Sequence, residues 1–214
     1  MRRLFRLGLT GGIAAGKSTV AARWRQGDTT LIETDELAHR TLARGTATHD
    51  EIVKAFGRGI LNADESINRA MLGELVFADE QKRLMLNEII HPVVRRMWTG
   101  ALAQLEQDGQ ATVAVVAIPL LYEVGAEKEF DCVVAVACSE QTQVARLAAK
   151  GLAETQAHAR IAAQWPMQKK MDKADFVIWN DGSLRVLAEQ ADRIWANLKE
   201  NHHGPQNQSD SKTS

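Results

Sequence analysis

Residues 7–19 limit the possible folds of this chain most strongly. They contain the pattern G-x-x-x-x-G-K-S, with Gly11, Gly16, Lys17 and Ser18 at its four fixed positions. A glycine-rich turn lets successive backbone N–H groups point at phosphate oxygens, and a following helix aims its positive dipole end at the same atoms. In this pattern the lysine reaches the β- and γ-phosphates and the serine hydroxyl binds Mg²⁺. We therefore predict a nucleotide-binding loop formed by Gly11, Gly12, Ile13, Ala14, Ala15, Gly16, Lys17, Ser18 and Thr19.

The residues on either side of this loop agree with that prediction. Residues 4–9 are mostly apolar and typical of a strand, and residues 19–25 contain neither Gly nor Pro and are typical of a helix. Strand, loop and helix is the order that phosphate binding requires. The alternative, an accidental glycine-rich turn, is disfavoured by this context.

Length and charge exclude several classes of protein. A chain of 214 residues is expected to form one domain. The net charge of −1 gives no support for a nucleic-acid or membrane surface, and no apolar run is long enough to span a bilayer. The basic start lacks a signal-peptide pattern, so we expect a cytoplasmic protein. Cys132 and Cys138 are expected to be buried free thiols, and the histidines show no metal-ligand spacing.

The rest of the chain alternates between strand and helix patterns. Further strands are predicted at residues 29–32, 111–118, 132–137 and 176–179, with helices between them. This alternation predicts an α/β fold in which a five-stranded parallel sheet is wrapped by helices on both faces. A helix from residue 184 to residue 195 closes the domain, and the polar tail from residue 201 is expected to be disordered.

A long helical region separates the second and third strands. Helices are predicted at residues 36–43 and 50–56. Residues 69–107 are almost entirely helical in pattern, and Pro92 is predicted to start the last helix of that run. We interpret its apolar stripes as core rather than as cofactor-binding surfaces. The stripes are Met71, Leu72, Leu75 and Val76; Leu84, Leu86, Ile89 and Ile90; and Val93, Met97, Ala101 and Leu105.

The sequence favours a small-molecule kinase over a switch GTPase. Asn-Lys-x-Asp is missing, and the third strand ends at Pro119 without an Asp. A kinase needs a carboxylate near the acceptor hydroxyl, and Asp35 follows the second strand, although it is also a good N-cap. A kinase also needs positive charge beside the phosphoryl group that is transferred, and a movable segment that covers the site and excludes water. Arg146 and Lys150 on one helix face, the hinge Gly151, and Lys169, Lys170 and Lys173 are candidates, with a solvated surface charge as the alternative for Arg146.

Several separated motifs together resemble the dephospho-CoA kinase family. They are the phosphate loop; Asp35 in an acidic pair; Phe56-Gly57; Arg69 with Leu72 and Val76-Phe77; His91-Pro92; Pro119-Leu120-Leu121-Tyr122-Glu123; Gln143 with Arg146; and Ala174-Asp175 with Val177-Ile178 and Asn180. The resemblance implies a P-loop kinase fold and ATP-dependent phosphorylation of the ribose 3′-hydroxyl of dephospho-CoA. It also implies a core at residues 1–58 and 108–200, a CoA-binding helical insertion at about 59–107, and a lid at about 148–170.

The resemblance also assigns roles to single residues. It implies Asp35 as the base, Lys17 and Arg146 as phosphate contacts, and Mg²⁺ with ATP. Substrate contacts would come from Asp35, Arg69, His91, Leu120 and Glu123.

Three of these assignments have alternatives. Arg69 is also placed to pair with Asp64 or Glu65, His91 to cap a helix start, and Glu123 to hold the loop after the third strand. Two positions depart from the family pattern, since Glu33 replaces an Asp and Lys150 replaces an Arg, and lysine makes no planar bidentate contact. Another small-molecule kinase and a nucleotide sensor without chemistry remain alternatives. We expect no nucleic-acid or membrane partner, and we expect the protein to be a monomer or a weak oligomer.

Overall fold

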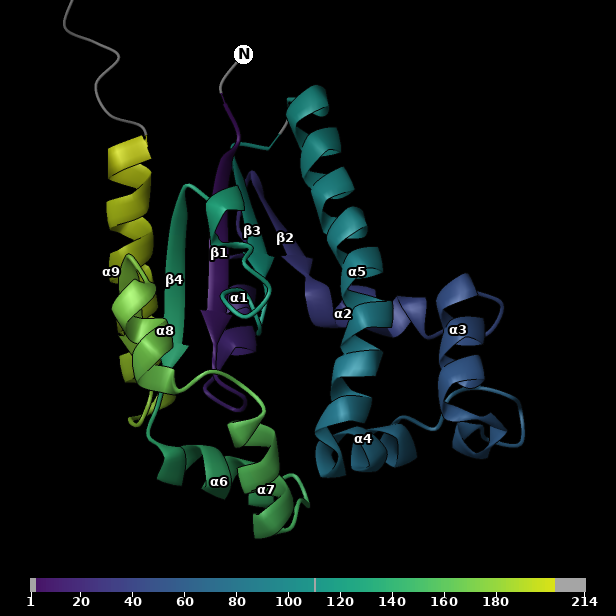
Figure 1. Ribbon diagram of the computed structural model, residues 1–214. Helices are drawn as coiled ribbons and strands as arrows, with labels where there is room; N and C mark the ends of the chain where they lie inside the picture. Colours follow the sequence, from purple (N-terminus) through teal and green to yellow (C-terminus); the bar gives the residue numbers. More distant parts are fainter. Residues whose placement is uncertain (1–2, 110, 203–214) are drawn as a thin grey trace, which may run out of the picture.

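The computed structural model describes residues 3–109 and 111–202. Its centre is a parallel five-stranded sheet, as predicted, and the order of its strands is β2-β3-β1-β4-β5 (Figure 1). The strands are β1 (Phe5–Gly11), β2 (Thr29–Glu33), β3 (Val113–Ala117), β4 (Cys132–Ala137) and β5 (Phe176–Trp179). Strand β1 lies in the middle of the sheet, which brings the phosphate loop to the centre of its carboxyl edge.

The helices occupy most of the remaining chain. They are α1 (Lys17–Trp24), α2 (Thr34–Thr41), α3 (Ala47–Phe56), α4 (Arg69–Ala78), α5 (Glu80–Asp108), α6 (Glu140–Ala148), α7 (Glu154–Ala162), α8 (Met167–Lys173) and α9 (Leu184–His202). Two short 3₁₀ turns, η1 (Arg58–Ile60) and η2 (Glu127–Glu129), complete the order. In Figure 1 the sheet lies between α9 and α5.

Strand β3 shows how the sheet is buried on both faces. Val115 packs into the core under α1 and α9, whereas Ala114 and Val116 pack under α5. This alternation follows from the two-residue period of a strand. On the first face Trp24 and Trp195 stack with ring centroids 5.3 Å apart, which joins α1 to α9.

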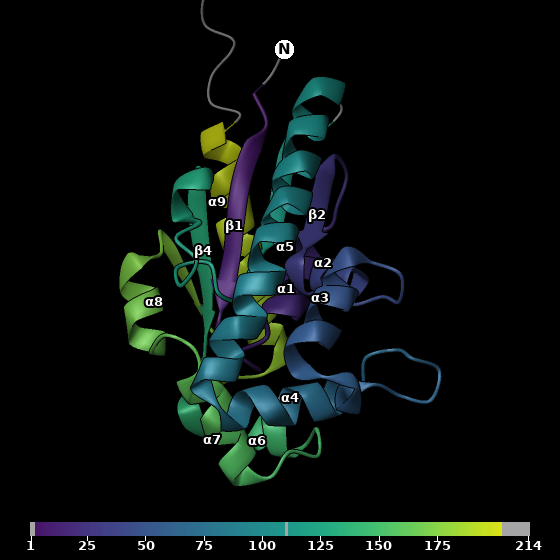
Figure 2. The ribbon, with the colours of Figure 1, turned by 45° about the vertical axis from the view of Figure 1, so that its right-hand side comes forward.

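Helices α3 and α4 enclose a separate small core. It consists of Ile52, Ile60, Ile67, Leu72 and Val76, all of them buried. Figure 2 shows α3 on the side of α5 away from β4, and α4 across the lower end of α5. The predicted helical region between the second and third strands therefore has its own packing centre.

The prediction for Pro92 is wrong, because it lies inside α5 rather than at a helix start. Proline removes the N–H that would bond the carbonyl of Glu88, but both residues are exposed, so water can reach this turn. The buried stripe is also shifted by one residue from the predicted one. Val94, Trp98 and Leu102 face the sheet, and tertiary packing carries the helix through the proline.

Other boundaries and exposures also differ from the predictions. Leu84 is 52% exposed and Leu184 71% exposed, so neither belongs to a core stripe. Helix α9 continues to His202, which corrects the predicted start of the tail, and residues 203–214 lie outside the described residues. Cys132 and Cys138 are buried and free, as predicted, and burial raises the pKa of their thiols to about 12 and about 11.

Among the helices of residues 3–109 and 111–202, none has both the length and the apolar character that crossing a bilayer requires.

Candidate active site

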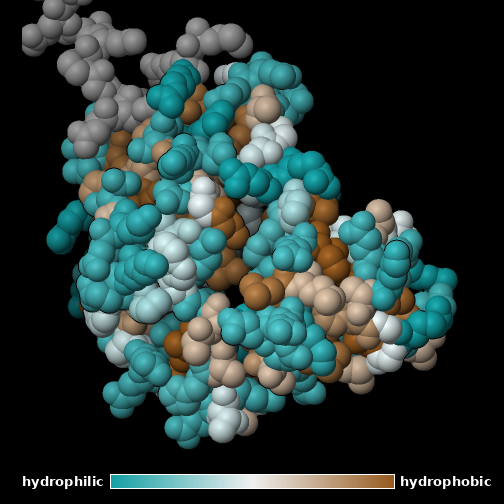
Figure 3. Space-filling model, in the orientation of Figure 1, coloured by the Kyte–Doolittle hydropathy of each residue, from teal (hydrophilic) through white to brown (hydrophobic). Residues whose placement is uncertain are grey.

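A cavity of about 940 Å³ lies at the carboxyl edge of the sheet. Its polar end is formed by the phosphate loop and the start of α2, and its apolar end by α5 and the segment after β3. Figure 3 shows apolar residues, in brown, around a hollow near the middle of this face. Its volume is at the upper end of the range for small-molecule sites.

Close backbone packing explains two of the glycines in the phosphate loop. A Cβ atom on Gly11 would lie 2.3 Å from the carbonyl oxygen of Val136. Gly16 has a left-handed backbone, with φ of 102°, and a Cβ there would lie 2.3 Å from Asn180 Nδ2. Gly16 is the N-cap of α1, and within the described chain no side chain caps this helix. The N-terminus of α1 is therefore available to an anionic ligand.

Lys17 and Asp35 meet at the polar end of the cavity. The Lys17 Nζ atom lies 3.8 Å from Asp35 Oδ2, and both residues line the cavity. Helix α2 begins at Thr34 with Glu33 as its N-cap, so Asp35 lies in the first turn and the N-cap interpretation is wrong. Thr34 Oγ1 donates a hydrogen bond to the carbonyl of Ala117 at 2.9 Å, which fixes the start of α2 over β3.

Arg146 reaches the phosphate loop from α6. Its Nη1 donates to the carbonyl of Ala14 at 3.1 Å, and its Nη2 donates to the carbonyl of Asn180 at 2.9 Å. The alternative of a solvated surface charge is therefore wrong. Lys150 follows α6 and also lines the cavity.

Three amide side chains hold the phosphate loop, and none of them was singled out as a site residue from the sequence. Gln143 Nε2 donates to the carbonyl of Ile13 at 2.7 Å, and the N–H of Ile13 donates to Gln164 Oε1 at 2.9 Å. Asn180 Nδ2 donates to the carbonyl of Ala15 at 2.7 Å. The motif signal at Gln143 and Asn180 pointed to these positions, but Gln164 gave no signal of its own.

His91 lies in the middle of α5 and lines the cavity, so the helix-capping alternative is wrong. Burial lowers the pKa of its imidazole, which favours the neutral ring. Leu86 and Ile90 from the same helix line the cavity too. These two positions were interpreted as core, and both are half-buried and pack against the small core of α3 and α4 while also lining the cavity.

Arg69 contacts the His39 ring, and His39 lines the cavity. Arg69 itself is exposed and is not among the described residues that line it. Its suggested pairing with Asp64 or Glu65 is wrong. The Ser66 hydroxyl donates to Asp64, while Glu65 pairs with other arginines.

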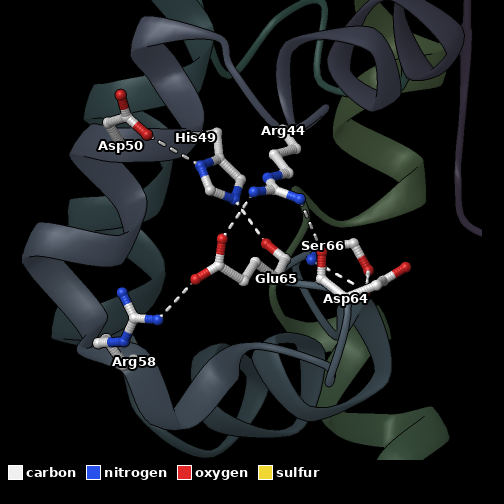
Figure 4. A network of polar contacts seen from close by, with 7 residues as sticks. All are labelled: Arg44, His49, Asp50, Arg58, Asp64, Glu65 and Ser66. Atoms are coloured by element: carbon white, nitrogen blue, oxygen red, sulfur yellow. Dashed lines mark hydrogen bonds and ion pairs between the residues drawn. The ribbon is translucent and has the colours of Figure 1, made fainter.

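A polar network connects α3 to the loop before α4 (Figure 4). Glu65 pairs with Arg44 at 2.9 Å and with Arg58 at 2.8 Å, and the Arg58 hydrogen bond lowers the pKa of its carboxyl. The buried His49 ring lies 3.0 Å from Asp50 Oδ1 and 3.1 Å from the carbonyl of Glu65. The residues of this network are not among the described residues that line the cavity, so we assign the network a structural role.

Glu123 holds the segment after β3. Its Oε1 lies 2.8 Å from Lys170 Nζ and accepts the N–H of Trp165 at 2.9 Å. It is not among the described residues that line the cavity, whereas Leu120 is. These contacts support the alternative role of Glu123, which is to hold the segment after β3 in place.

The three lysines that were candidates for covering the phosphoryl group are engaged elsewhere. Lys170 is fully buried beside Glu123, Lys169 lies over the Trp165 ring at 3.4 Å, and Lys173 pairs with Glu127 at 3.2 Å. None of the three is among the described cavity-lining residues. That expectation is wrong, because burial and aromatic packing compete with phosphate for lysine side chains.

Comparison with known proteins gives one consistent family. The family model for dephospho-CoA kinase matches residues 5–185. A dephospho-CoA kinase from Geobacillus kaustophilus is 44% identical over 185 residues, which cover 86% of this chain and 92% of that protein.

Solved structures agree with the sequence comparison. The protein TT1252 from Thermus thermophilus is 33% identical with a TM-score of 0.72, and the match covers 93% of this chain and 98% of that one. Dephospho-CoA kinase from Campylobacter jejuni is 25% identical with a TM-score of 0.66, over 92% of this chain and 98% of that one. These matches extend over the sheet, the phosphate loop and the helices around the cavity, and the chain belongs to the dephospho-CoA kinase family.

Proposed function

We propose that Lys17, Asp35 and Arg146 act together in the reaction of this family, in which ATP phosphorylates dephospho-CoA to make CoA. The observation that carries this proposal is the 3.8 Å approach of Lys17 to Asp35 in a cavity with one polar and one apolar end. The lysine that binds phosphate and the carboxylate that orients the hydroxyl would then both lie beside the place where the γ-phosphate meets the acceptor.

On this proposal the β- and γ-phosphates of ATP bind the loop from Gly11 to Thr19, with Lys17 as the cation beside them. Asp35 orients the ribose 3′-hydroxyl of dephospho-CoA and takes its proton. The hydroxyl oxygen forms a bond to the γ-phosphorus while the bond from phosphorus to the β,γ-bridging oxygen breaks, and ADP leaves. Arg146 neutralises charge on the phosphates from its position at Ala14.

Mg²⁺ fits the residues at the polar end. The Ser18 hydroxyl lines the cavity and is an oxygen donor of the kind that Mg²⁺ prefers. Among the described residues there is no cluster of three His, Cys, Asp or Glu side chains for a metal. This suits Mg²⁺, which usually takes one or two protein ligands, and when bound it would neutralise phosphate charge.

The acceptor is proposed to lie along α5. Leu86, Ile90, Val94 and Trp98 form an apolar wall that suits the uncharged arm of dephospho-CoA. His91 and Leu120 line the same space, and Arg69 and Glu123 remain proposed contacts from its surroundings. Residues 59–107 are then the CoA-binding insertion.

The lid is proposed at residues 148–170. In support, Arg160 of α7 lies 4.7 Å from the ring centroid of Phe77, which lines the cavity from α4. Figures 1 and 2 both show α7 next to α4 at this end of the molecule. A cytoplasmic location and a monomeric or weakly oligomeric state also remain proposals.

The test is ADP release by the purified protein with ATP and Mg²⁺. Dephospho-CoA is the acceptor, and AMP and adenosine are control acceptors. Strong stimulation by dephospho-CoA alone is expected. Stimulation by a control acceptor instead, or hydrolysis that no acceptor changes, would contradict the proposed acceptor.

A further inference from the structure

Lys170 is a charged side chain with no exposed surface. Its Nζ lies 2.8 Å from Glu123 Oε1 and donates to the carbonyl of Pro119 at 2.8 Å. The Glu123 side chain is itself only 15% exposed, and its Oε2 is buried without a hydrogen-bond partner. Replacing a buried ion pair by apolar residues of similar size often leaves the stability of a fold unchanged or raises it. Stability alone therefore does not explain why this pair is present.

The pair connects two segments that lie far apart in the sequence. Pro119 and Glu123 belong to the segment after β3, and Lys170 belongs to α8. Glu123 also accepts the N–H of Trp165, whose ring is stacked on Tyr122 with centroids 6.2 Å apart. The segment after β3 is therefore attached to α8 by charge and a hydrogen bond, and to the residue Trp165 before α8 by a hydrogen bond and ring packing.

Both attached segments contact the proposed active site. Pro119, Leu120 and Val124 line the cavity on either side of Glu123. Gln164, the residue before Trp165, accepts the N–H of Ile13 in the phosphate loop at 2.9 Å. Residues 164–170 thus contact the phosphate loop at one end, and at the other end they hold the cavity wall formed by Pro119, Leu120 and Val124.

We propose that Glu123 and Lys170 are positioning residues that fix Pro119, Leu120 and Val124 against the bound acceptor. The inference rests on the proposed function, because it takes the cavity beside Leu120 as the dephospho-CoA site. Without the pair, this wall is free to shift and the acceptor hydroxyl loses its alignment with the phosphate. ATP binding depends on the loop and Lys17. The pair reaches the loop only indirectly, through Trp165 and the hydrogen bond between Gln164 and Ile13, so the defect falls mainly on the acceptor.

The experiment compares the purified wild type with Lys170→Met, with the double variant Glu123→Gln/Lys170→Met, and with Lys173→Met. The double variant leaves no unpaired buried charge and keeps an amide oxygen to accept the Trp165 N–H. Lys173→Met is the matched control from the same helix. It removes an ion pair with Glu127 and the contacts of Lys173 with the Tyr122 and Trp165 rings, but it leaves the Glu123–Lys170 pair in place. Steady-state kinetics with each substrate varied and a thermal midpoint are measured for each protein.

For Lys170→Met we expect kcat/KM for dephospho-CoA to fall about tenfold or more, while KM for ATP changes less than about threefold, because misalignment acts on the acceptor. The double variant is expected to melt higher than Lys170→Met but to keep the acceptor defect. Lys173→Met is expected to resemble the wild type. If Lys170→Met does not fold, the double variant alone carries the comparison.

Recovery of kcat/KM together with the thermal midpoint in the double variant would show a purely structural pair and overturn the inference. So would equal losses for ATP and for dephospho-CoA. Failure of the wild type to use dephospho-CoA would instead contradict the proposed function, so the two failures are told apart.

Discussion

The Lys17 ammonium lies 3.8 Å from the Asp35 carboxylate, although the two residues follow different strands and are separated by β3 in the sheet. Strand β1 delivers Lys17 through the phosphate loop, and β2 delivers Asp35 through the first turn of α2. Asp35 is 64% exposed, so it faces the open cavity rather than the core. This arrangement leaves the carboxylate accessible to an incoming hydroxyl.

Replacing Asp35 by Asn is expected to lower kcat by about 10²-fold or more, the scale of a positioned acid–base group. The amide keeps the size of the side chain but cannot take the proton. KM for ATP should change little, because the loop and Lys17 remain. Steady-state kinetics at saturating ATP and dephospho-CoA measure this effect, and an unchanged kcat would remove Asp35 from the mechanism.

Replacing Lys17 by Ala is expected to lower kcat/KM for ATP by about 10²- to 10³-fold, as for loss of a group that stabilises developing charge. The fold should remain, because the Lys17–Asp35 pair involves an exposed carboxylate and such pairs contribute less than about 1 kcal/mol. Kinetics and a thermal midpoint are measured on one preparation. Retained turnover at saturating ATP would show that Lys17 is dispensable.

Gly11→Ala is expected to destabilise the protein by about 1–3 kcal/mol or more, the usual range for overpacking. The new Cβ would meet the backbone carbonyl of Val136 at 2.3 Å, and this oxygen is fixed in β4. Gly59→Ala is the control, since a Cβ there meets nothing within 4 Å. Denaturant unfolding compares the two, and equal stabilities would contradict the close approach of β1 and β4.

The sheet was predictable from the sequence because strand patterns depend on local sequence. Residues 132–137 and 176–179 form strands with the predicted bounds. The continuous apolar run of β4 suits a strand buried on both faces, whereas β5 is an edge strand in which Val177 and Trp179 are exposed. Pro92 was not predictable in the same way. Local rules favour proline at a helix start, and the contacts of Trp98 and Leu102 with the sheet decide otherwise.

The site was predictable only where a motif fixes it. The loop and Lys17 lie where the pattern requires, but the fate of Lys170 depends on Glu123, which is 47 positions away in the chain and has no local signal. Arg69 likewise contacts His39 rather than its sequence neighbours. Long-range partners of charged side chains are set by the fold, so reading the chain locally misses them.

His49 predicts a dependence of stability on pH. Its hydrogen bond to Asp50 raises the pKa of the imidazole above its ordinary value of 6.5 (Figure 4). The folded state therefore holds the His49 proton more tightly than the unfolded state. The resulting stabilisation is fully present below pH 6.5 and is lost as the pH rises through the folded-state pKa.

The Asp50→Asn variant isolates the pH-dependent stabilisation that comes from the His49–Asp50 hydrogen bond. Asp50 is largely exposed, so the wild type should exceed the variant in unfolding free energy at pH 6 by less than about 1 kcal/mol, and the difference should shrink by pH 8. Glu51→Gln is the matched control, since it removes the same charge from the next residue of α3 without touching the His49 ring.

Urea unfolding at pH 6, 7 and 8 measures the unfolding free energies of the wild type and the two variants. A difference that stays constant for Asp50→Asn, or that shrinks equally for Glu51→Gln, would mean that the His49–Asp50 hydrogen bond does not couple folding to pH.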